Sequence, residues 1–322
     1  MRMQLRGLLC AALLILPIAH ARAYPDKPVK IVIPFLPGGT ADQLMRLVAV
    51  KASALFGQPV VVENRAGAGG NIGANEVARA PADGYTLLFT PPGPLAINQH
   101  LFPTMPYDAR TAFRPVSILA TMPSVLVVGP GIQAGTLPEL AGEARKAPGT
   151  LTYASQGFGT TTQLLAELFA IKAGVKLVHV PYKGAPPIMT DLRSGRVGMV
   201  FFDSANAIPQ LSQNADLRAL AVTGMRRNAA LPNVPTFEEA GVTGMNTSVW
   251  MGLAAPAHTP DPVVEAWHAA LAKIVAMPDV RQRIQALGAE PWASTPAEML
   301  QVVEQDSRLW AEVIRATGAA NR

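Results

Sequence analysis

The residues best suited to bind a ligand form a glycine-containing loop early in the chain. Residues 31–42 read IVIPFLPGGTAD, an apolar run followed by a Pro-Gly-Gly turn and the start of a helix with apolar periodicity. Thr40 or Asp42 is expected to be the N-cap of that helix. Glycines let a ligand approach the backbone, and the first amides of a helix point outward at the positive end of its dipole. The pattern therefore predicts an anion site without a basic side chain, against the alternative of a plain strand-to-helix connection.

A second loop repeats this arrangement further along the chain. Residues 155–163 read SQGFGTTTQ, in which glycines and hydroxyl side chains follow an apolar strand and precede a helix. Gly159, Thr160 and Thr161 are candidates for ligand contact here, although either threonine can simply cap the helix. Many α/β proteins have one such loop, whereas two loops of this kind favour a shared site that holds two polar ends of one ligand.

An aspartate and a glycine run are the candidates outside these two loops. Asp203 ends the apolar run 198–202, and open α/β sheets place ligand groups at strand ends. It can accept a hydrogen bond from a ligand hydroxyl or ammonium, or it can be an exposed loop residue. The run 67–73, GAGGNIG, approximates a dinucleotide fingerprint, but its last glycine comes one place late. Close helix packing or lining of a cleft is the preferred interpretation of this run.

Catalytic and metal-binding patterns are missing from the sequence. It contains no G-x-S-x-G, H-E-x-x-H or S-x-x-K motif. Its one cysteine, Cys10, lies inside an N-terminal leader. The four histidines that follow this leader are scattered along the chain: His100, His179, His258 and His268. His179 is interpreted as a hydrogen-bonded structural histidine at a strand edge. We therefore expect no catalytic residue, no metal and no cofactor.

The first 23 residues are typical of a signal peptide. Arg2 and Arg6 precede an apolar run at 8–18 that is too short to span a bilayer, and the small residues of Ala-Arg-Ala end at Ala23. Cleavage before Tyr24 and export to the periplasm are expected. The formal net charge of +5 includes three arginines of this leader, so the mature chain is only weakly basic and nucleic-acid binding has little support.

The remaining chain alternates strands and helices, which predicts the α/β class. Strands are expected at 29–35, 60–64, 85–90, 116–119, 125–128, 151–154, 176–181, 197–203, 217–222 and 250–255. Helices are expected at 40–56, 137–146, 187–194, 262–277, 279–287 and 296–316. Two more helices are expected to follow the glycine runs at 67–71 and 157–162 and to end at residues 79 and 172. A short helix is expected within 231–241. The predicted organisation is a signal peptide (1–23), a first domain (24–126), a second domain (127–246), and a return to the first domain (247–322) that packs back on it. A cleft between two such domains is a preferred place for a small ligand.

The mature chain resembles the Bug family, the TctC-like periplasmic receptors of tripartite tricarboxylate transporters. Seven segments match in order: 24–42, 62–73, 82–87, 180–184, 217–223, 231–241 and 250–256. The resemblance implies a type II periplasmic-binding-protein fold, whose two α/β domains close on a ligand by hinge motion. It implies a small carboxylate ligand, such as a di- or tricarboxylate, an amino acid or an aromatic acid, and delivery to membrane transporter subunits.

The resemblance also carries residue roles onto this sequence. Ligand carboxylates are held in that family by backbone amides, hydroxyls and bridging waters. The two walls of the cleft would be Phe35, Gly38, Gly39, Thr40 and Asp42 on one side and Gly159, Thr160, Thr161 and Asp203 on the other, with Thr90 contributing from a strand end. Gln163 departs from the family, which often has a histidine near the start of that helix, so Gln163 would influence ligand choice. A monomer is expected. The alternatives are a ligand-dependent partner of a periplasmic sensor and a periplasmic hydrolase or transferase.

Overall fold

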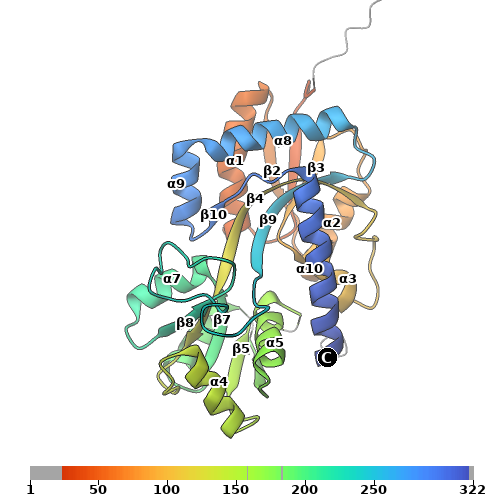
Figure 1. Cartoon of the computed structure of the whole chain (residues 1–322). Coiled ribbons are helices and arrows are strands. Elements are labelled where there is room, and N and C mark those ends of the chain that lie inside the picture. The colour runs from red at the N-terminus through yellow and green to blue at the C-terminus, as the bar shows by residue number, and fades with distance from the viewer. Residues whose placement is uncertain (1–23, 158, 183, 319–322) are drawn as a thin grey trace, which may run out of the picture.

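A computed structural model of the chain describes residues 24–157, 159–182 and 184–318. It has two lobes, one above the other in Figure 1, each built on a β-sheet with helices against it. The α/β class predicted from the sequence is confirmed. The predicted signal peptide at residues 1–23 lies outside the described residues. In the part of the chain that is described, no helix is both long and apolar enough to cross a bilayer.

The upper lobe begins with a parallel sheet whose central strand is buried except at Lys30. The strand β1 (Val29–Ile33) lies between β2 (Val60–Asn64) and β3 (Thr86–Thr90) and runs parallel to both. Its near-continuous apolar run suits a parallel strand that is buried on both faces. The connecting elements are α1 (Thr40–Phe56), the 3₁₀ turn η1 (Ala68–Gly70) and α2 (Asn71–Ala78).

One long strand, β4 (Phe113–Val128), belongs to both lobes. Its first part pairs antiparallel with β9 (Ser248–Pro256). From Ser124 onward it pairs with β7 (Met199–Asp203) and β8 (Arg218–Val222) of the lower lobe. The prediction of two shorter strands here was wrong. The two prolines of β4 disturb its strand pairing little, because Pro115 lies at a register shift and Pro123 lies where β4 changes its partner strand. Before β4, the π-helical segment η2 (Gly93–Ile97) and α3 (Asn98–Leu101) form a short connection that the sequence did not predict.

The lower lobe continues the sheet in the order β4-β7-β5-β6. Its elements are α4 (Leu137–Lys146), β5 (Thr152–Ser155), α5 (Thr161–Ala173), β6 (Val178–Pro181), α6 (Ala185–Arg193), β7 (Met199–Asp203), α7 (Ser204–Gln213) and β8 (Arg218–Val222). The short helix expected within 231–241 does not form. Thr236 and Glu239 bond reciprocally as at a helix start, but Gly241 follows within one turn, which is too short for a helix.

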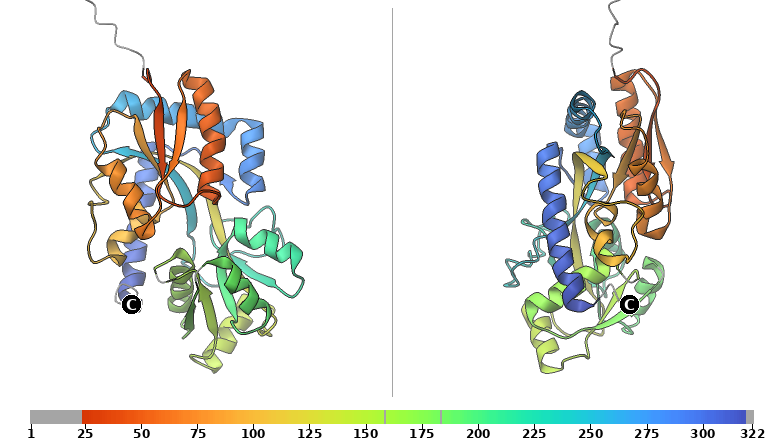
Figure 2. Two further views of the ribbon diagram at one scale, coloured as in Figure 1. Left: turned by 180° about the vertical axis from the view of Figure 1, so that it is seen from behind. Right: turned by 90° about the vertical axis from the view of Figure 1, so that its right-hand side faces the viewer.

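The C-terminal segment supports both lobes. Two helices pack on the core of the upper lobe, α8 (Asp261–Ala276) and α9 (Pro278–Ala286). The short strand β10 (Glu290–Pro291) follows them and pairs with β4. The last helix, α10 (Pro296–Thr317), begins beside that lobe and runs down past β4 to the lower one (Figures 1 and 2).

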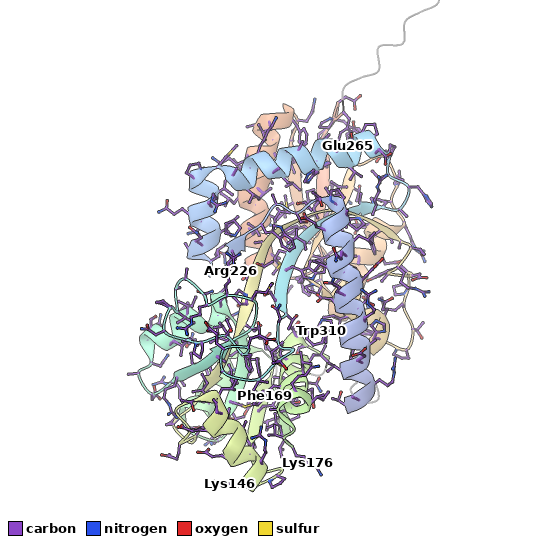
Figure 3. The ribbon with its side chains drawn as sticks, in the orientation of Figure 1. Lys146, Phe169, Lys176, Arg226, Glu265 and Trp310 are labelled. Carbon is purple, nitrogen blue, oxygen red and sulfur yellow. The ribbon has the colours of Figure 1, made fainter. Side chains whose placement is uncertain are left out.

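The expectation that the whole C-terminal tail packs back on the first domain is therefore wrong for α10. Its Met299 lies in an upper-lobe cluster with Trp250, whereas Trp310, Val313 and Ile314 lie in the lower-lobe core that contains Phe169. Figure 3 shows Trp310 on the part of α10 that faces the lower lobe. The reason is that the apolar face of α10 continues to its last turn and has to be buried against the lower lobe as well.

Candidate ligand-binding site

A cavity of about 1010 Å³ lies between the two lobes. The upper lobe lines it with the loops after β1 and β3, and the lower lobe with the loops after β5 and β7. Nine of the eleven residues predicted for the site line this cavity: Phe35, Gly38, Gly39, Thr40, Asp42, Gly159, Thr160, Thr161 and Asp203. Thr90 and Gln163 are not in the lining. The structure thus brings together the two glycine loops, which the sequence separates by more than a hundred residues.

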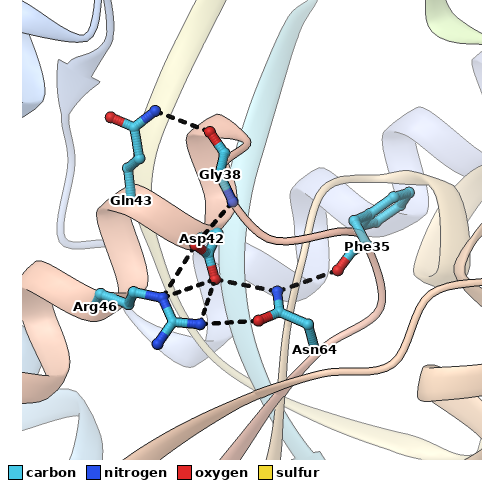
Figure 4. A network of polar contacts seen from close by, with 6 residues as sticks. All are labelled: Phe35, Gly38, Asp42, Gln43, Arg46 and Asn64. Atoms are coloured by element: carbon cyan, nitrogen blue, oxygen red, sulfur yellow. Dashed lines mark hydrogen bonds and ion pairs between the residues drawn. The ribbon is translucent and has the colours of Figure 1, made fainter.

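The upper loop is held by Asp42, which is 5% exposed. Its carboxylate accepts hydrogen bonds from the Gly38 amide, Arg46 Nε and Asn64 Nδ2, each at 3.0 Å (Figure 4). Burial opposes ionisation of this group, but the three bonds outweigh burial and lower the pKa of Asp42. Asp42 therefore supports the loop from behind with its charge already compensated.

The N-terminus of α1 stays without a side-chain cap. The N-cap is Gly39, so the expectation that Thr40 or Asp42 caps the helix was wrong. The left-handed turn at Gly38, with φ of +89°, places the Asp42 carboxylate below the loop, where it binds the Gly38 amide and not the amides of the first helical turn. The outward amides of Thr40 and Ala41, both in the cavity lining, are left for an anion.

The lower loop is braced in a similar way by Gln163. This side chain is fully buried, and its Oε1 accepts a hydrogen bond from the Gly159 amide at 2.6 Å. Its Nε2 has no partner among the described residues. Gly159 itself adopts φ of +73°, a conformation that glycine tolerates at no steric cost. Gln163 is thus placed to shape the loop from beneath, away from the cavity surface.

Thr160 and Thr161 play different structural roles at the start of α5. The Thr160 hydroxyl donates to the Gly157 carbonyl at 2.7 Å, so it is occupied within the loop and does not cap the helix. The Thr161 hydroxyl has no partner among the described residues and lines the cavity. With the uncapped first amides of α5 beside it, Thr161 presents both a hydroxyl and a backbone donor to the cavity.

Asp203 lies at the cavity edge as the N-cap of α7. Its carboxylate accepts from the Asn206 amide and side chain, both at 2.9 Å. Burial raises the pKa of Asp203, and the bonds from Asn206 and Ala205 only partly oppose this. No cationic side chain among the described residues accompanies Asp203 in the lining. An unpaired carboxylate in a site of this kind favours a ligand group that donates, and repels a second negative charge.

The apolar part of the lining was missed by the sequence analysis. It comes from short or distant elements whose residues resemble ordinary core residues: Leu101, Phe102, Met122, Leu165, Val249 and Met251. The interpretation of the glycine run is confirmed, because Gly69 lines the cavity and a side chain at Gly73 would meet the Arg65 carbonyl. Thr90 is fully buried, with its hydroxyl bonded to the Pro91 carbonyl, and Pro91 lines the cavity in its place.

The charged residues of the lining exclude a site in which a cationic side chain of the lining forms a salt bridge with an anionic ligand. Its charged members among the described residues are the two aspartates, Asp42 and Asp203, and it includes no lysine, arginine or histidine. No group of three or more histidine, cysteine, aspartate or glutamate side chains in the described ranges is arranged to hold a metal ion. An anion in this cavity would be held by backbone amides and hydroxyls.

Comparison with known proteins gives a consistent result over most of the chain. The family model "Tripartite tricarboxylate transporter family receptor" matches residues 44–319. Protein BugT of Bordetella pertussis is 34% identical over 300 residues, which are 93% of this chain and 92% of BugT.

Two solved structures combine sequence and structural similarity. One is described as R. palustris Rpa4515 with adipate, with 36% identity, a TM-score of 0.78, and coverage of 92% of this chain and 98% of the other. The second is MatC (Rpa3494) from Rhodopseudomonas palustris with bound malate, with 32% identity, a TM-score of 0.75, and coverage of 90% and 100%. The chain belongs to the receptor family of the tripartite tricarboxylate transporters, which includes the Bug proteins.

Proposed function

We propose that this receptor binds a small carboxylate with an apolar body in the cavity between its lobes and delivers it to the membrane subunits of a tripartite transporter. One observation carries the proposal. The uncapped N-termini of α1 and α5, one from each lobe, line the same cavity, and no described cationic side chain shares that lining. Helix N-termini bind carboxylates through their outward amides. A ligand that engages both termini would stabilise the closed arrangement of the lobes.

The lining supports a mono- or dicarboxylate over a tricarboxylate. Each further negative charge on the ligand meets the field of Asp203 without a counter-charge, and like charges repel strongly in a partly desolvated cavity. The apolar side chains suit an alkyl or aromatic body between the polar ends. The bound adipate and malate of the two structural relatives are consistent with this class.

The remaining elements of the proposal concern location, partners and chemistry. We place the protein in the periplasm as a monomer, exported with a signal peptide that is cleaved before Tyr24. The proposed domains are 24–126 with 247–322, and 127–246, and α10 also packs on the second of them. We assign no cofactor and no catalysis, in line with the receptor family to which the chain belongs. A role as the partner of a sensor would appear as a lost transcriptional response with intact uptake after gene deletion.

The test is a panel of carboxylates offered to the purified protein. Adipate, L-malate, L-glutamate, benzoate and citrate are compared by the shift in melting temperature and then by calorimetric titration. A ligand that binds the folded state raises the melting temperature by mass action. We expect a rise with adipate or benzoate that exceeds the rise with citrate.

The Thr161→Val variant ties the binding to the cavity. It removes the free hydroxyl of the α5 N-terminus and should weaken the best ligand about tenfold, the usual value of one hydrogen bond to a charged group. The melting temperature without ligand should stay the same. A panel in which no carboxylate shifts the melting temperature, or in which citrate binds best, would contradict the proposal.

A further inference from the structure

His179 lies on the edge strand β6 and is not part of the cavity lining. It is half-buried, and its ring stacks on Tyr153 of the neighbouring strand, with centroids 4.8 Å apart and planes 12° from parallel. Its Nε2 is 2.6 Å from Ser155 Oγ, at the end of β5 where the lower ligand loop begins. The interpretation of His179 as a hydrogen-bonded structural histidine thus covers only part of what its position allows.

Ser155 connects His179 to the loop. Its hydroxyl oxygen lies 3.1 Å from the Gly157 amide, which donates to it, and 3.0 Å from the Gly157 carbonyl, to which it donates. The same carbonyl accepts from the Thr160 hydroxyl at 2.7 Å. The Thr160 hydroxyl is in turn 2.9 Å from that of Thr162, which accepts from the Gln156 amide at 2.9 Å. Thr160 and Thr162 both line the cavity.

The single proton of each hydroxyl sets the direction of this chain. Because Thr160 donates to the Gly157 carbonyl, Thr162 must be the donor to Thr160. Because Ser155 donates to that same carbonyl, it has no proton left for His179. The assignment that gives each of these two contacts of Ser155 a proton places a hydrogen on His179 Nε2, which donates it to Ser155. Under this assignment each hydroxyl donates its one proton, Thr160 and Thr162 each accept one hydrogen bond, and Ser155 accepts two, so the bonds support one another.

We propose that His179 is a positioning residue for ligand binding, whose Nε2–H acts through Ser155 to fix the Gly157 peptide and, with it, the Thr160–Thr162 start of α5. The inference rests on the proposed function for the class of ligand, whereas the arrangement of hydrogen bonds from His179 to Thr162 does not depend on it. Without the His179 donor, Ser155 keeps its two contacts with Gly157 but loses the third bond that holds its hydroxyl in place, so the orientation of Gly157 is less firmly fixed. The amides and the Thr161 hydroxyl that face the cavity would then be less well ordered for a carboxylate.

The hydrogen on Nε2 is tested first, on the protein without ligand. Long-range ¹H–¹⁵N correlation spectra of the imidazole distinguish a protonated from an unprotonated Nε2. We expect a protonated Nε2 at neutral pH, and the Ser155→Ala variant should shift its resonance. A neutral ring with its hydrogen on Nδ1 alone would overturn the inference, whatever the ligand is.

Two replacements of His179 separate its hydrogen bond from its packing. His179→Phe keeps a ring that can stack on Tyr153 and removes the donor, whereas His179→Gln loses the ring and keeps an amide donor near the same position. Titration with adipate and with L-malate should give an affinity about tenfold lower in His179→Phe, as expected for one lost hydrogen bond, and within about threefold of wild type in His179→Gln. If packing alone matters, the order of the two variants is reversed.

The double variant His179→Phe/Ser155→Ala tests whether the two residues act as one unit. If His179 acts through Ser155, adding His179→Phe to Ser155→Ala should change the affinity by less than about twofold, because His179 then has no hydroxyl to act through. Independent, additive losses would contradict the inference. If wild-type protein binds neither adipate nor L-malate, the proposed ligand class is wrong, and the protonation of Nε2 still decides the geometry of the chain.

Discussion

At the scale of single residues, the polar side chains nearest the cavity mostly orient the backbone. Asp42 accepts a hydrogen bond from the Gly38 amide, and Gln163 accepts one from the Gly159 amide. Both side chains therefore already have a backbone donor before a ligand binds. The donors that remain are the first amides of α1 and α5, which no side chain caps. Backbone donors at fixed positions recognise a carboxylate without the desolvation cost of a buried cation. Selection among carboxylates then depends on Asp203 and the apolar lining.

Asp203→Asn should strengthen the binding of a dicarboxylate. At pH 8 the variant should bind adipate about tenfold more tightly than wild type, because about 1.4 kcal/mol of like-charge repulsion is removed from a poorly solvated cavity. Burial raises the pKa of Asp203, so this advantage should shrink as the pH is lowered and the wild-type carboxyl takes up a proton. Calorimetric titration at pH 8 and at successively lower pH values measures both effects. Asp216→Asn, at an exposed position of the same lobe, is the control. Equal or weaker adipate binding by Asp203→Asn would show that its charge does not face the ligand.

At the scale of elements, glycines determine how closely helices approach the strand ends. A side chain at Gly73 in α2 would lie 2.7 Å from the Arg65 carbonyl and 3.0 Å from Pro34 Cα, both of them backbone atoms that cannot easily move. This contact seats α2 against the loop that leads from β1 to the cavity. Gly142 in α4 is the opposite case, because a side chain there would meet nothing within 4 Å.

The two glycines form a matched pair for stability. Gly73→Ala should lower the free energy of unfolding by about 1–3 kcal/mol through overpacking. Gly142→Ala should raise it by about 0.5–1 kcal/mol, since alanine favours a helix where space is available. Urea denaturation of both variants gives the comparison. A neutral Gly73→Ala would mean that α2 is free to shift away from β1.

At the scale of the whole molecule, the lobes are joined by β4, β9 and α10. A partly buried polar contact links two of these connections, where Trp250 Nε1 of β9 donates to Asp306 of α10 at 2.7 Å. Burial raises the pKa of Asp306 to about 6, although the bond from Trp250 opposes this. A small void beside Asp306 is lined by residues of both lobes, among them Ser124, Thr161 and Trp310. The ionisation of Asp306 therefore affects the joint between the lobes.

Asp306 should make the protein less stable as the pH rises. Its pKa is about 6 in the folded state against 3.8 for the unperturbed group, so its stabilising contribution is complete below about pH 4 and is lost as the pH passes 6. Asp306→Asn stays neutral and can still accept from Trp250. Its free energy of unfolding should exceed that of wild type by up to about 3 kcal/mol at pH 8, with little difference near pH 4.

Urea denaturation of Asp306→Asn and wild type at pH 4, 6 and 8 measures this dependence. Glu304→Gln, at an exposed position of the same helix, should show no such pH dependence. A constant difference between Asp306→Asn and wild type at all three pH values would mean that Asp306 does not titrate in this range.

Much of the site could be predicted because its signals are local. The turn at Gly38 and Gly39, the hydroxyls after Gly159 and the strand end at Asp203 are each contained in a few residues of sequence, and all of them line one cavity. Thr90 and Gln163 are outside the cavity lining for a common reason. Their chemistry suits ligand contact, but the direction of a side chain at a strand end or in the first helical turn depends on what packs around it.

The sequence by itself determined the α/β class, the position of most helices and strands, and the two helix N-termini that suit an anion, because periodicity, proline and glycine act over short stretches of chain. Only the tertiary structure decided that these termini face one another, that Leu101, Phe102 and Met251 form the apolar wall, and that α10 spans both lobes. Those features depend on contacts between segments far apart in the chain. A sequence pattern shows which surfaces must be buried, but packing decides which partner buries them.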